Sequence, residues 1–165
     1  MGDLVPPTVF RIEGSPLGPD SLQFFIELNP DHHYFSFTPT EKRKLPQMTL
    51  FDYLINNADR KAGHLLIDLK GELWLIDHGL SFYEDDKLRT VIWDHAGQPI
   101  PQASLADIER VRCSLSAGAP MGQAIESYLT DREIKALHVR ADQLLKIGQF
   151  PSPPEDRRAY SWQLV

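Results

Sequence analysis

Four side chains that can hold a metal ion or move a proton stand in two short segments of the sequence. Asp59 and His64 frame the first segment, DRKAGH, and Asp77 and His78 belong to the second, IDHG. Phosphoryl transfer needs such a set, because a carboxylate must orient the attacking hydroxyl while further ligands hold a divalent metal ion against the nucleotide phosphates. The spacing of an aspartate, a second ligand five residues later and another aspartate further on therefore indicates metal-dependent phosphoryl chemistry.

Two β-type runs between these segments predict how they meet. Residues 64–69 and 72–76 are joined by a tight turn at Lys70-Gly71, so we expect an antiparallel hairpin. The loop before the first strand and the loop after the second lie at the same end of a hairpin. We therefore expect the two segments to converge.

Each residue of the two segments also has a structural interpretation. A loop aspartate such as Asp59 or Asp77 often caps backbone amides. His64 suits a hydrogen-bonded core position as well as a ligand role. We expect His78 to pack against its neighbours or orient the loop, and Arg60 to pair with a carboxylate in the loop.

Outside this hairpin the sequence predicts only a few further strands. The β-type runs 8–13 and 21–28 are joined by a Gly/Pro-rich connection, which favours two strands there. Residues 29–47 mix prolines, aromatic residues and a basic cluster without periodicity, and are expected to form an irregular surface segment. Trp74 and Phe82 are expected in the core around the central hairpin.

A helix of about two turns is predicted before the first segment. Apolar residues recur at helical spacing from Thr49, and Thr49 with Asp52 resembles a capping box. The polar stretch that follows begins with Asn56 and Asn57, which we expect to hydrogen-bond the loop backbone.

The second half of the chain is predicted to be helical. Ser104 is expected to cap one helix, and a shorter helix covers about 121–129. Thr130 and Glu133 form a capping box before a further helix, which Gly148 ends. The Pro-rich tail is expected to be extended, with two aromatic residues, Tyr160 and Trp162, docked on the body.

The composition is that of an ordinary soluble globular domain, with 165 residues of which 42% are hydrophobic and 24% charged. A net charge of −6 disfavours nucleic-acid binding. No apolar run is long enough for a membrane span and the first residues lack signal-peptide features, so we expect a cytoplasmic protein. The single cysteine, Cys113, fits a reducing compartment and is expected to be buried.

A resemblance to the phosphatidylinositol 3-/4-kinase-like superfamily lies in residues 51–82, FDYLINNADRKAGHLLIDLKGELWLIDHGLSF. The sequence is similar in particular to an actinobacterial group of uncharacterised proteins in that superfamily. Further similarity lies in VPPTVFR, SLQFFIE and LRTVIW, so the resemblance covers most of residues 4–100. It implies a protein-kinase-like fold, ATP as the nucleotide partner, and Mg²⁺ or Mn²⁺.

The resemblance also implies roles for individual residues. Asp59 would be the catalytic base, with Arg60 beside it in the catalytic loop, and Asp77 the metal-binding aspartate. His64 stands where the family has a second metal-binding asparagine, and imidazole suits softer ions such as Mn²⁺ better than Mg²⁺. The strand 21–28 would be the hinge that pairs with adenine, and its residues beside the base would be Gln23, Phe24, Phe25, Ile26 and Glu27.

The glycine-rich phosphate loop and the strand lysine of a kinase small lobe have no counterpart upstream of residue 4. We therefore expect an α+β fold that corresponds to a protein-kinase-like C-lobe, without a complete N-lobe. Residues 1–165 would form one domain, in which the expected regions are hinge-side strands at 1–28, a catalytic core at 48–100, a helical cap at 101–150 and an extended tail at 151–165.

The expected function is transfer of the γ-phosphoryl group of ATP to a protein or small-molecule hydroxyl. Two alternatives remain open: a catalytically degenerate kinase-fold binding module, and a metal-dependent hydrolase that uses His64, Asp77 and His78. The acceptor is not specified by the sequence. A lipid acceptor is less favoured, because Lys42-Arg43-Lys44 is the one basic cluster that could face a membrane.

Overall fold

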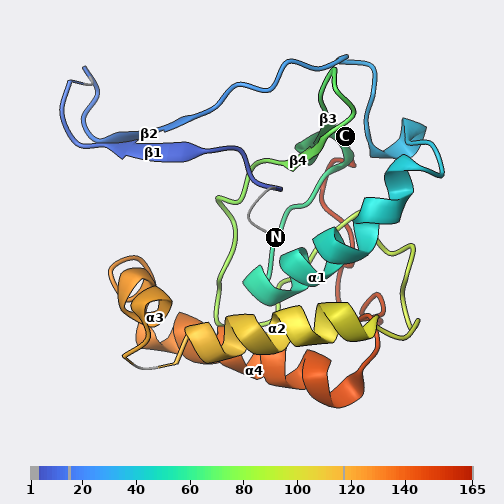
Figure 1. Ribbon diagram of the computed structural model, residues 1–165. Coiled ribbons are helices and arrows are strands. Elements are labelled where there is room, and N and C mark those ends of the chain that lie inside the picture. Colours follow the sequence, from blue (N-terminus) through green and yellow to red (C-terminus); the bar gives the residue numbers. More distant parts are fainter. Residues whose placement is uncertain (1–3, 15, 117, 165) are drawn as a thin grey trace.

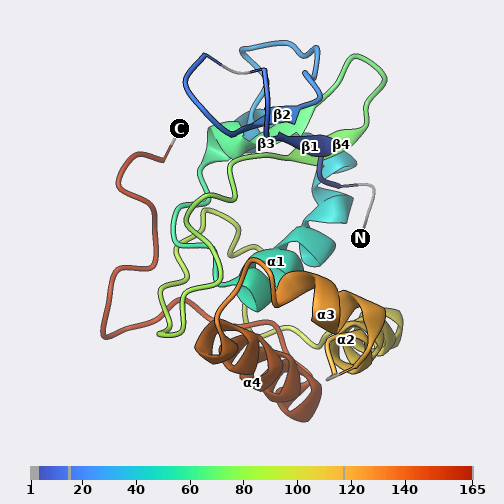
Figure 2. The same cartoon turned by 90° about the vertical axis from the view of Figure 1, so that its left-hand side faces the viewer.

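One central helix, α1 (Leu45–Ile55), separates two small hairpins from a layer of helices (Figures 1 and 2). The structure is a computed structural model that describes residues 4–14, 16–116 and 118–164. Residues 1–3 and 165, at the outer limits of the expected end regions, lie outside the described residues. The mixture of helices and small sheets is the α+β class expected from the sequence.

Both predicted hairpins are present, with strands shorter than the apolar runs that predicted them. In the first, β1 (Thr8–Arg11) pairs antiparallel with β2 (Asp20–Gln23). In the second, β3 (Leu65–Ile67) pairs with β4 (Leu73–Leu75) around a turn in which Gly71 has a φ of +81°. The first hairpin reaches out from the body (Figure 1), and several of its apolar side chains are exposed.

Helix α1 is apolar on two sides because it contributes to both hydrophobic cores. Leu45 and Met48 pack beneath the second hairpin, in a core that also contains Ile92. Leu50 and Leu54 belong to the second core, on the side of the helical layer. A helix that is buried on two faces is needed here because the hairpin is too small to form a core by itself.

The helical layer consists of α2 (Gln102–Ser114), α3 (Pro120–Ile125) and α4 (Asp131–Ile147). Thr130 accepts a hydrogen bond from the backbone N–H of Glu133, and the Glu133 carboxylate bonds back to Thr130, which confirms the predicted capping box. Gly148 ends α4 in the left-handed conformation, with a φ of +65°. Among the helices of the described residues, none is both long and apolar enough to cross a lipid bilayer.

Two predicted helix starts were wrong. Helix α1 begins four residues before Thr49, whose hydroxyl instead donates to the carbonyl oxygen of Leu45. Pro46 lies in the first turn, where a proline costs no hydrogen bond. Ser104 lies inside α2, because that helix already begins after Pro101.

Residues 29–47 are more structured than expected. They contain two 3-10 turns, η1 (Tyr34–Ser36) and η2 (Glu41–Lys44). The rings of Tyr34 and Phe37 are buried in the core beneath the second hairpin. Aromatic residues in this stretch therefore serve as core anchors.

Three expected burial assignments also need correction. Cys113 is exposed, on a face of α2 where its thiol lies 3.5 Å from the Glu109 carboxylate. Trp74 and Phe82 are only partly buried, and the indole N–H of Trp74 donates to Asp68 at 3.1 Å. In the tail, the small residues Ala159 and Ser161 are buried, whereas Tyr160 and Trp162 are largely exposed.

Candidate active site

The open end of the second hairpin brings the two candidate segments together. The backbone N–H of Ile76 donates to the carbonyl oxygen of His64 at 3.1 Å, which continues the β3–β4 pairing past the strands. Beyond it, Nε2 of His64 lies 3.4 Å from Oδ2 of Asp77. The two residues that the sequence assigned to metal binding are therefore neighbours.

Asp77 has an unusual backbone conformation that turns the chain at this point. Its φ is +56°, in the left-handed region that few residues other than glycine, asparagine and aspartate adopt. The side chain of Asp77 is 56% exposed and that of His64 is 14% exposed. A carboxylate that faces solvent beside a half-buried imidazole is open to a ligand.

Asp59 lies in the first segment, which also carries His64, and local contacts hold it in place. Its backbone N–H donates to Oδ1 of Asn57 at 3.0 Å, and its carboxylate lies 3.2 Å from Nζ of Lys61. The carboxylate remains 27% exposed. Asp59 is therefore fixed by its neighbours and still accessible to a substrate.

The pKa of His64 responds to burial and to the charged groups around it. Burial lowers the pKa of His64, and the carboxylates of Asp77 and Asp59 each raise it in part. Arg60 and Lys61 lower the same pKa. Because lowering prevails, His64 is neutral near pH 7 and its ring can act as a ligand.

Arg60 holds the loop from inside. Its side chain is 0% exposed, and the guanidinium forms a two-pronged contact with Asp52 of α1, with Nε 2.9 Å from Oδ2 and Nη2 2.9 Å from Oδ1. Nη1 donates to the carbonyl oxygen of Ile76 at 2.6 Å. The geometry favours a structural role for Arg60, which links the loop of Asp59 and the loop of Asp77 to α1.

Two buried asparagines support the loop, as expected. Asn57 donates to Asp52 at 3.2 Å and accepts from the backbone of Asp59. Asn56, with a φ of +54°, donates to the carbonyl oxygens of Tyr83 and Asp85. Together they attach the segment after Asp77 to the end of α1.

His78 does not join the cluster of ligands. Its ring packs edge to face against Phe51, with the ring centroids 5.4 Å apart, and within the described chain its buried Nε2 has no hydrogen-bond partner. Burial lowers the pKa of His78 to about 4, so the ring is neutral. This agrees with the packing role expected from the sequence.

The C-terminal tail forms hydrogen bonds with the loop that carries Asp59. The hydroxyl of Ser161 donates to the carbonyl oxygen of Arg60 at 3.1 Å, and the backbone N–H of Ala62 donates to Leu164 at 2.7 Å. Figure 2 shows the tail rising from α4 past α1 toward the hairpins. The tail contact was not predicted. Arg60 does pair with a carboxylate, but the partner is Asp52 of α1 and not a loop residue as expected, although an aspartate among the apolar residues of α1 is a signal for a buried partner.

The candidate hinge lies at the other end of the same hairpin. Strand β2 ends at Gln23, and the next residues, Phe24, Phe25, Ile26 and Glu27, line a cavity of about 350 Å³ together with the β3–β4 turn. Leu28 then forms an isolated antiparallel bridge with Asp68. The strand predicted over 21–28 is therefore split, and the part assigned to adenine forms a cavity wall.

The donor set at the open end fits a divalent cation shared with phosphate oxygens. Asp77 offers an exposed carboxylate and His64 a neutral imidazole, and nucleotide-bound Mg²⁺ commonly takes only one or two protein ligands. In residues 4–14, 16–116 and 118–164, no three His, Cys, Asp or Glu side chains are grouped closely enough to enclose a metal ion by themselves.

The α+β fold is consistent with a kinase-like domain. Residues 9–106, well over half of the chain, match the family model of phosphatidylinositol 3- and 4-kinase, and the protein belongs to this family. It is also similar to Protein Rv2133c of Mycobacterium tuberculosis (strain ATCC 25618 / H37Rv), with 41% identity over 110 residues. That match covers 67% of this chain and 39% of the relative, so the chain spans well under half of the relative's length. No solved structure matches the chain.

Proposed function

We propose that the protein is a kinase-type phosphotransferase that moves the γ-phosphoryl group of ATP to a protein or small-molecule hydroxyl. The observation that carries this proposal is the contact between His64 and Asp77 beside the accessible carboxylate of Asp59. Membership of the kinase family supports the same reaction class. The described chain would serve as the C-lobe of the kinase fold, in one domain over 1–165.

In this proposal Asp59 is the catalytic base. Its carboxylate would accept the hydroxyl proton of the acceptor, and the Lys61 ammonium at 3.2 Å would hold it in place. Arg60 is fully buried, so it would act as a positioning residue that fixes the loop through Asp52 and Ile76.

Asp77 and His64 would hold Mg²⁺ or Mn²⁺ against the phosphates of the nucleotide. When bound, the metal supplies charge neutralisation at the phosphoryl oxygens. The imidazole of His64 favours Mn²⁺ over Mg²⁺ compared with an amide oxygen.

The cavity at residues 24–27 would receive the adenine. It lies at the turn end of the β3–β4 hairpin, whereas Asp77 and His64 lie at the open end. Three residue steps, from Leu65 at the start of β3 to Asp68 just past its end, span roughly 10 Å at about 3.3 Å per residue. A nucleotide that lies along the hairpin would therefore have its base at one end and its phosphates at the other.

Calorimetric titration with Mn-ATP tests the proposal on this chain and on a longer chain that carries any sequence preceding Met1. We expect Asp77→Ala to abolish metal-dependent binding, because it removes the accessible carboxylate ligand. Asp59→Asn should keep binding and lose phosphoryl transfer. Asp31→Ala removes an exposed carboxylate from another loop and serves as the matched control. Unchanged Mn-ATP affinity in Asp77→Ala would overturn the proposal.

The second candidate, a kinase-fold binding module without catalysis, is favoured by the Lys61–Asp59 ion pair, in which the Lys61 ammonium occupies the carboxylate that an acceptor hydroxyl would need. Tight Mn-ATP binding in both chains, with no phosphoryl transfer to water or to added hydroxyl compounds, would support this module. Turnover that is lost in Asp59→Asn would exclude it.

A further inference from the structure

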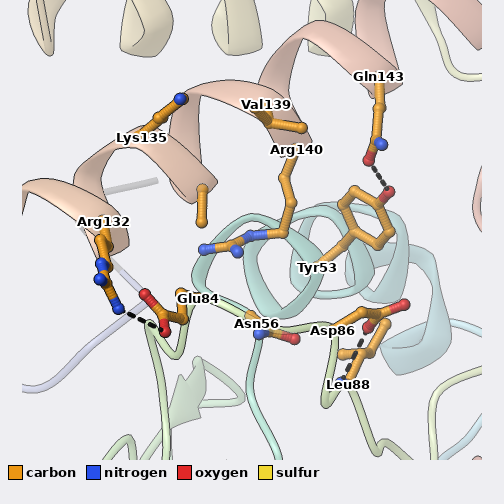
Figure 3. Close-up of a pocket in the computed structure, with 11 residues that line it drawn as sticks. Tyr53, Asn56, Glu84, Asp86, Leu88, Arg132, Lys135, Val139, Arg140 and Gln143 are labelled. Atoms are coloured by element: carbon orange, nitrogen blue, oxygen red, sulfur yellow. Dashed lines mark hydrogen bonds and ion pairs between the residues drawn. The ribbon is translucent and has the colours of Figure 1, made fainter.

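A second cavity, of about 450 Å³, lies between α4 and the chain segment that follows Gly79 (Figure 3). Its upper wall is formed by Val139 and Arg140 of α4, and its lower wall by Asn56 and Leu88. Tyr53 closes one side, where its hydroxyl donates to Gln143 at 3.0 Å. The size is that of a typical small-molecule site, and the proposed phosphotransfer uses none of these residues.

The guanidinium of Arg140 is the buried polar group of this cavity. Arg140 is 8% exposed, and its Nε donates to the carbonyl oxygen of Leu54 at 2.8 Å. Nη1 reaches the carbonyl oxygen of Tyr83 at 3.4 Å, whereas the buried Nη2 has no partner among the described residues. Figure 3 shows this group extending from α4 into the space above Asn56, between Glu84 and Tyr53. A buried charged donor without an acceptor is unfavourable, so this geometry favours a ligand that supplies an acceptor oxygen.

The carboxylates around the cavity already have other cations. Glu84 lies 3.6 Å from Arg132, and Asp86 lies 2.6 Å from Arg157. Neither Arg140 nor Lys135, at the cavity rim, forms an ion pair within the described part of the chain. The charged side chains that line the cavity are three cations, Arg132, Lys135 and Arg140, and two carboxylates, Glu84 and Asp86. The lining therefore keeps one positive charge in excess, although Asp86 also interacts electrostatically with Arg140.

We propose that this cavity binds a small organic anion, whose carboxylate or phosphate oxygens accept the free hydrogen bond of the Arg140 guanidinium. An apolar body next to the anionic group would pack on the ring of Tyr53 and on Leu88 and Val139. Lys135 would add a second positive charge at the entrance. Arg140 is suited to this task because a guanidinium matches the geometry of carboxylate and phosphate oxygens.

Titrations of ¹⁵N-labelled protein with phenyl phosphate and with benzoate test the proposal. We expect saturable shifts of the Arg140 Nε–H resonance with at least one of these probes, and the tighter probe identifies the anionic group. Benzyl alcohol has the same ring without the charge and should leave that resonance in place. Equal shifts with benzyl alcohol, or no saturable shift with either anion up to tens of millimolar, would overturn the proposal.

Variants locate the binding without disturbing the folding role of Arg140. Val139 is 46% exposed, so Val139→Trp should fold normally and fill the cavity from its rim. We expect it to weaken probe binding roughly tenfold or more, because the indole takes the space of the probe and keeps its anionic group from the charged hydrogen bond with Arg140. Lys135→Ala should weaken binding less, and Lys146→Ala, on an exposed part of the same helix, should match the unaltered protein. Full affinity in Val139→Trp would contradict the proposal.

Discussion

The guanidinium of Arg60 and the carboxylate of Asp52 form an ion pair from which solvent is excluded, with both side chains 0% exposed. The pair joins the loop that carries Asp59 to the middle of α1. Both charges are stable there because further donors and acceptors surround them: Asn57 donates to Asp52, and Arg60 donates to Ile76. The position of the candidate base therefore depends on a contact in the protein interior.

Arg60→Met should destabilise the protein by about 3–5 kcal/mol, because it leaves the Asp52 carboxylate buried without a cation. The free energy of unfolding from urea titration measures this loss. Lys44→Ala is the control, since it breaks the solvent-exposed Lys44–Glu72 pair and should lose less than about 1 kcal/mol. Similar losses in the two variants would show that the buried pair is not needed. Adding Asp52→Leu to Arg60→Met should restore most of the stability.

His78 makes the stability depend on pH. Its pKa is lowered from 6.5 to about 4 in the folded protein, so the unfolded chain binds the proton more readily. The stabilisation by neutral His78 is therefore complete above pH 6.5 and is lost as the pH falls toward about 4. In His78→Gln, the free energy of unfolding should fall by about 1–3 kcal/mol less than in the unaltered protein as the pH drops from 6.5 to about 4. Urea unfolding at several pH values measures this difference. Parallel pH profiles for the two proteins would refute the role of His78.

The capping box of α4 should contribute measurably to stability. Thr130→Ala removes the acceptor for the backbone N–H of Glu133 and should lower the free energy of unfolding by about 1 kcal/mol. Ser104 serves as a comparison because the sequence suggested a cap there and the structure places it inside α2. Ser104→Ala should be neutral or slightly stabilising. A loss as large as that of Thr130→Ala would mean that α2 begins at Ser104.

Gly122 is needed because α3 passes close to the end of α2. A Cβ at this position would lie 2.7 Å from the carbonyl oxygen of Ser116 and 3.1 Å from that of Leu115. Both atoms are backbone, so Gly122→Ala should destabilise the protein by about 1–3 kcal/mol despite the better helix propensity of alanine. Gly63→Ala is the control, since among the described residues, its two chain neighbours aside, no heavy atom lies within 4 Å of the added Cβ. Thermal unfolding of the two variants should differ clearly, and equal midpoints would contradict the close approach.

Local sequence signals predicted the elements whose structure is set locally. The β3–β4 hairpin follows from its two apolar runs and Gly71, and the two ends of α4 follow from Thr130 and Gly148. The prediction that the Asp59 and Asp77 segments converge also depends on the hairpin alone, since a two-stranded turn returns the chain to its starting edge.

Long-range contacts were not predictable from the sequence in the same way. The partner of Arg60 is Asp52, which the sequence pattern placed in a helix cap. That prediction was wrong because the true start of α1 depends on burial of Leu45. The exposure of Cys113 likewise depends on which face of α2 meets α4, and composition gives no information about that choice.

The contacts of the tail with the candidate loop also have a consequence for biosynthesis. Residues 159–164 hold the backbone at Arg60, Ala62 and Thr90, and the Ser161–Arg60 contact alone spans 101 residues of sequence. Contacts over such separations form late, because the intervening chain must first be ordered. On the ribosome, the loop that carries Asp59 can therefore reach its final shape only after Leu164 has emerged, and the helices would be in place before the nascent protein acquires a finished site.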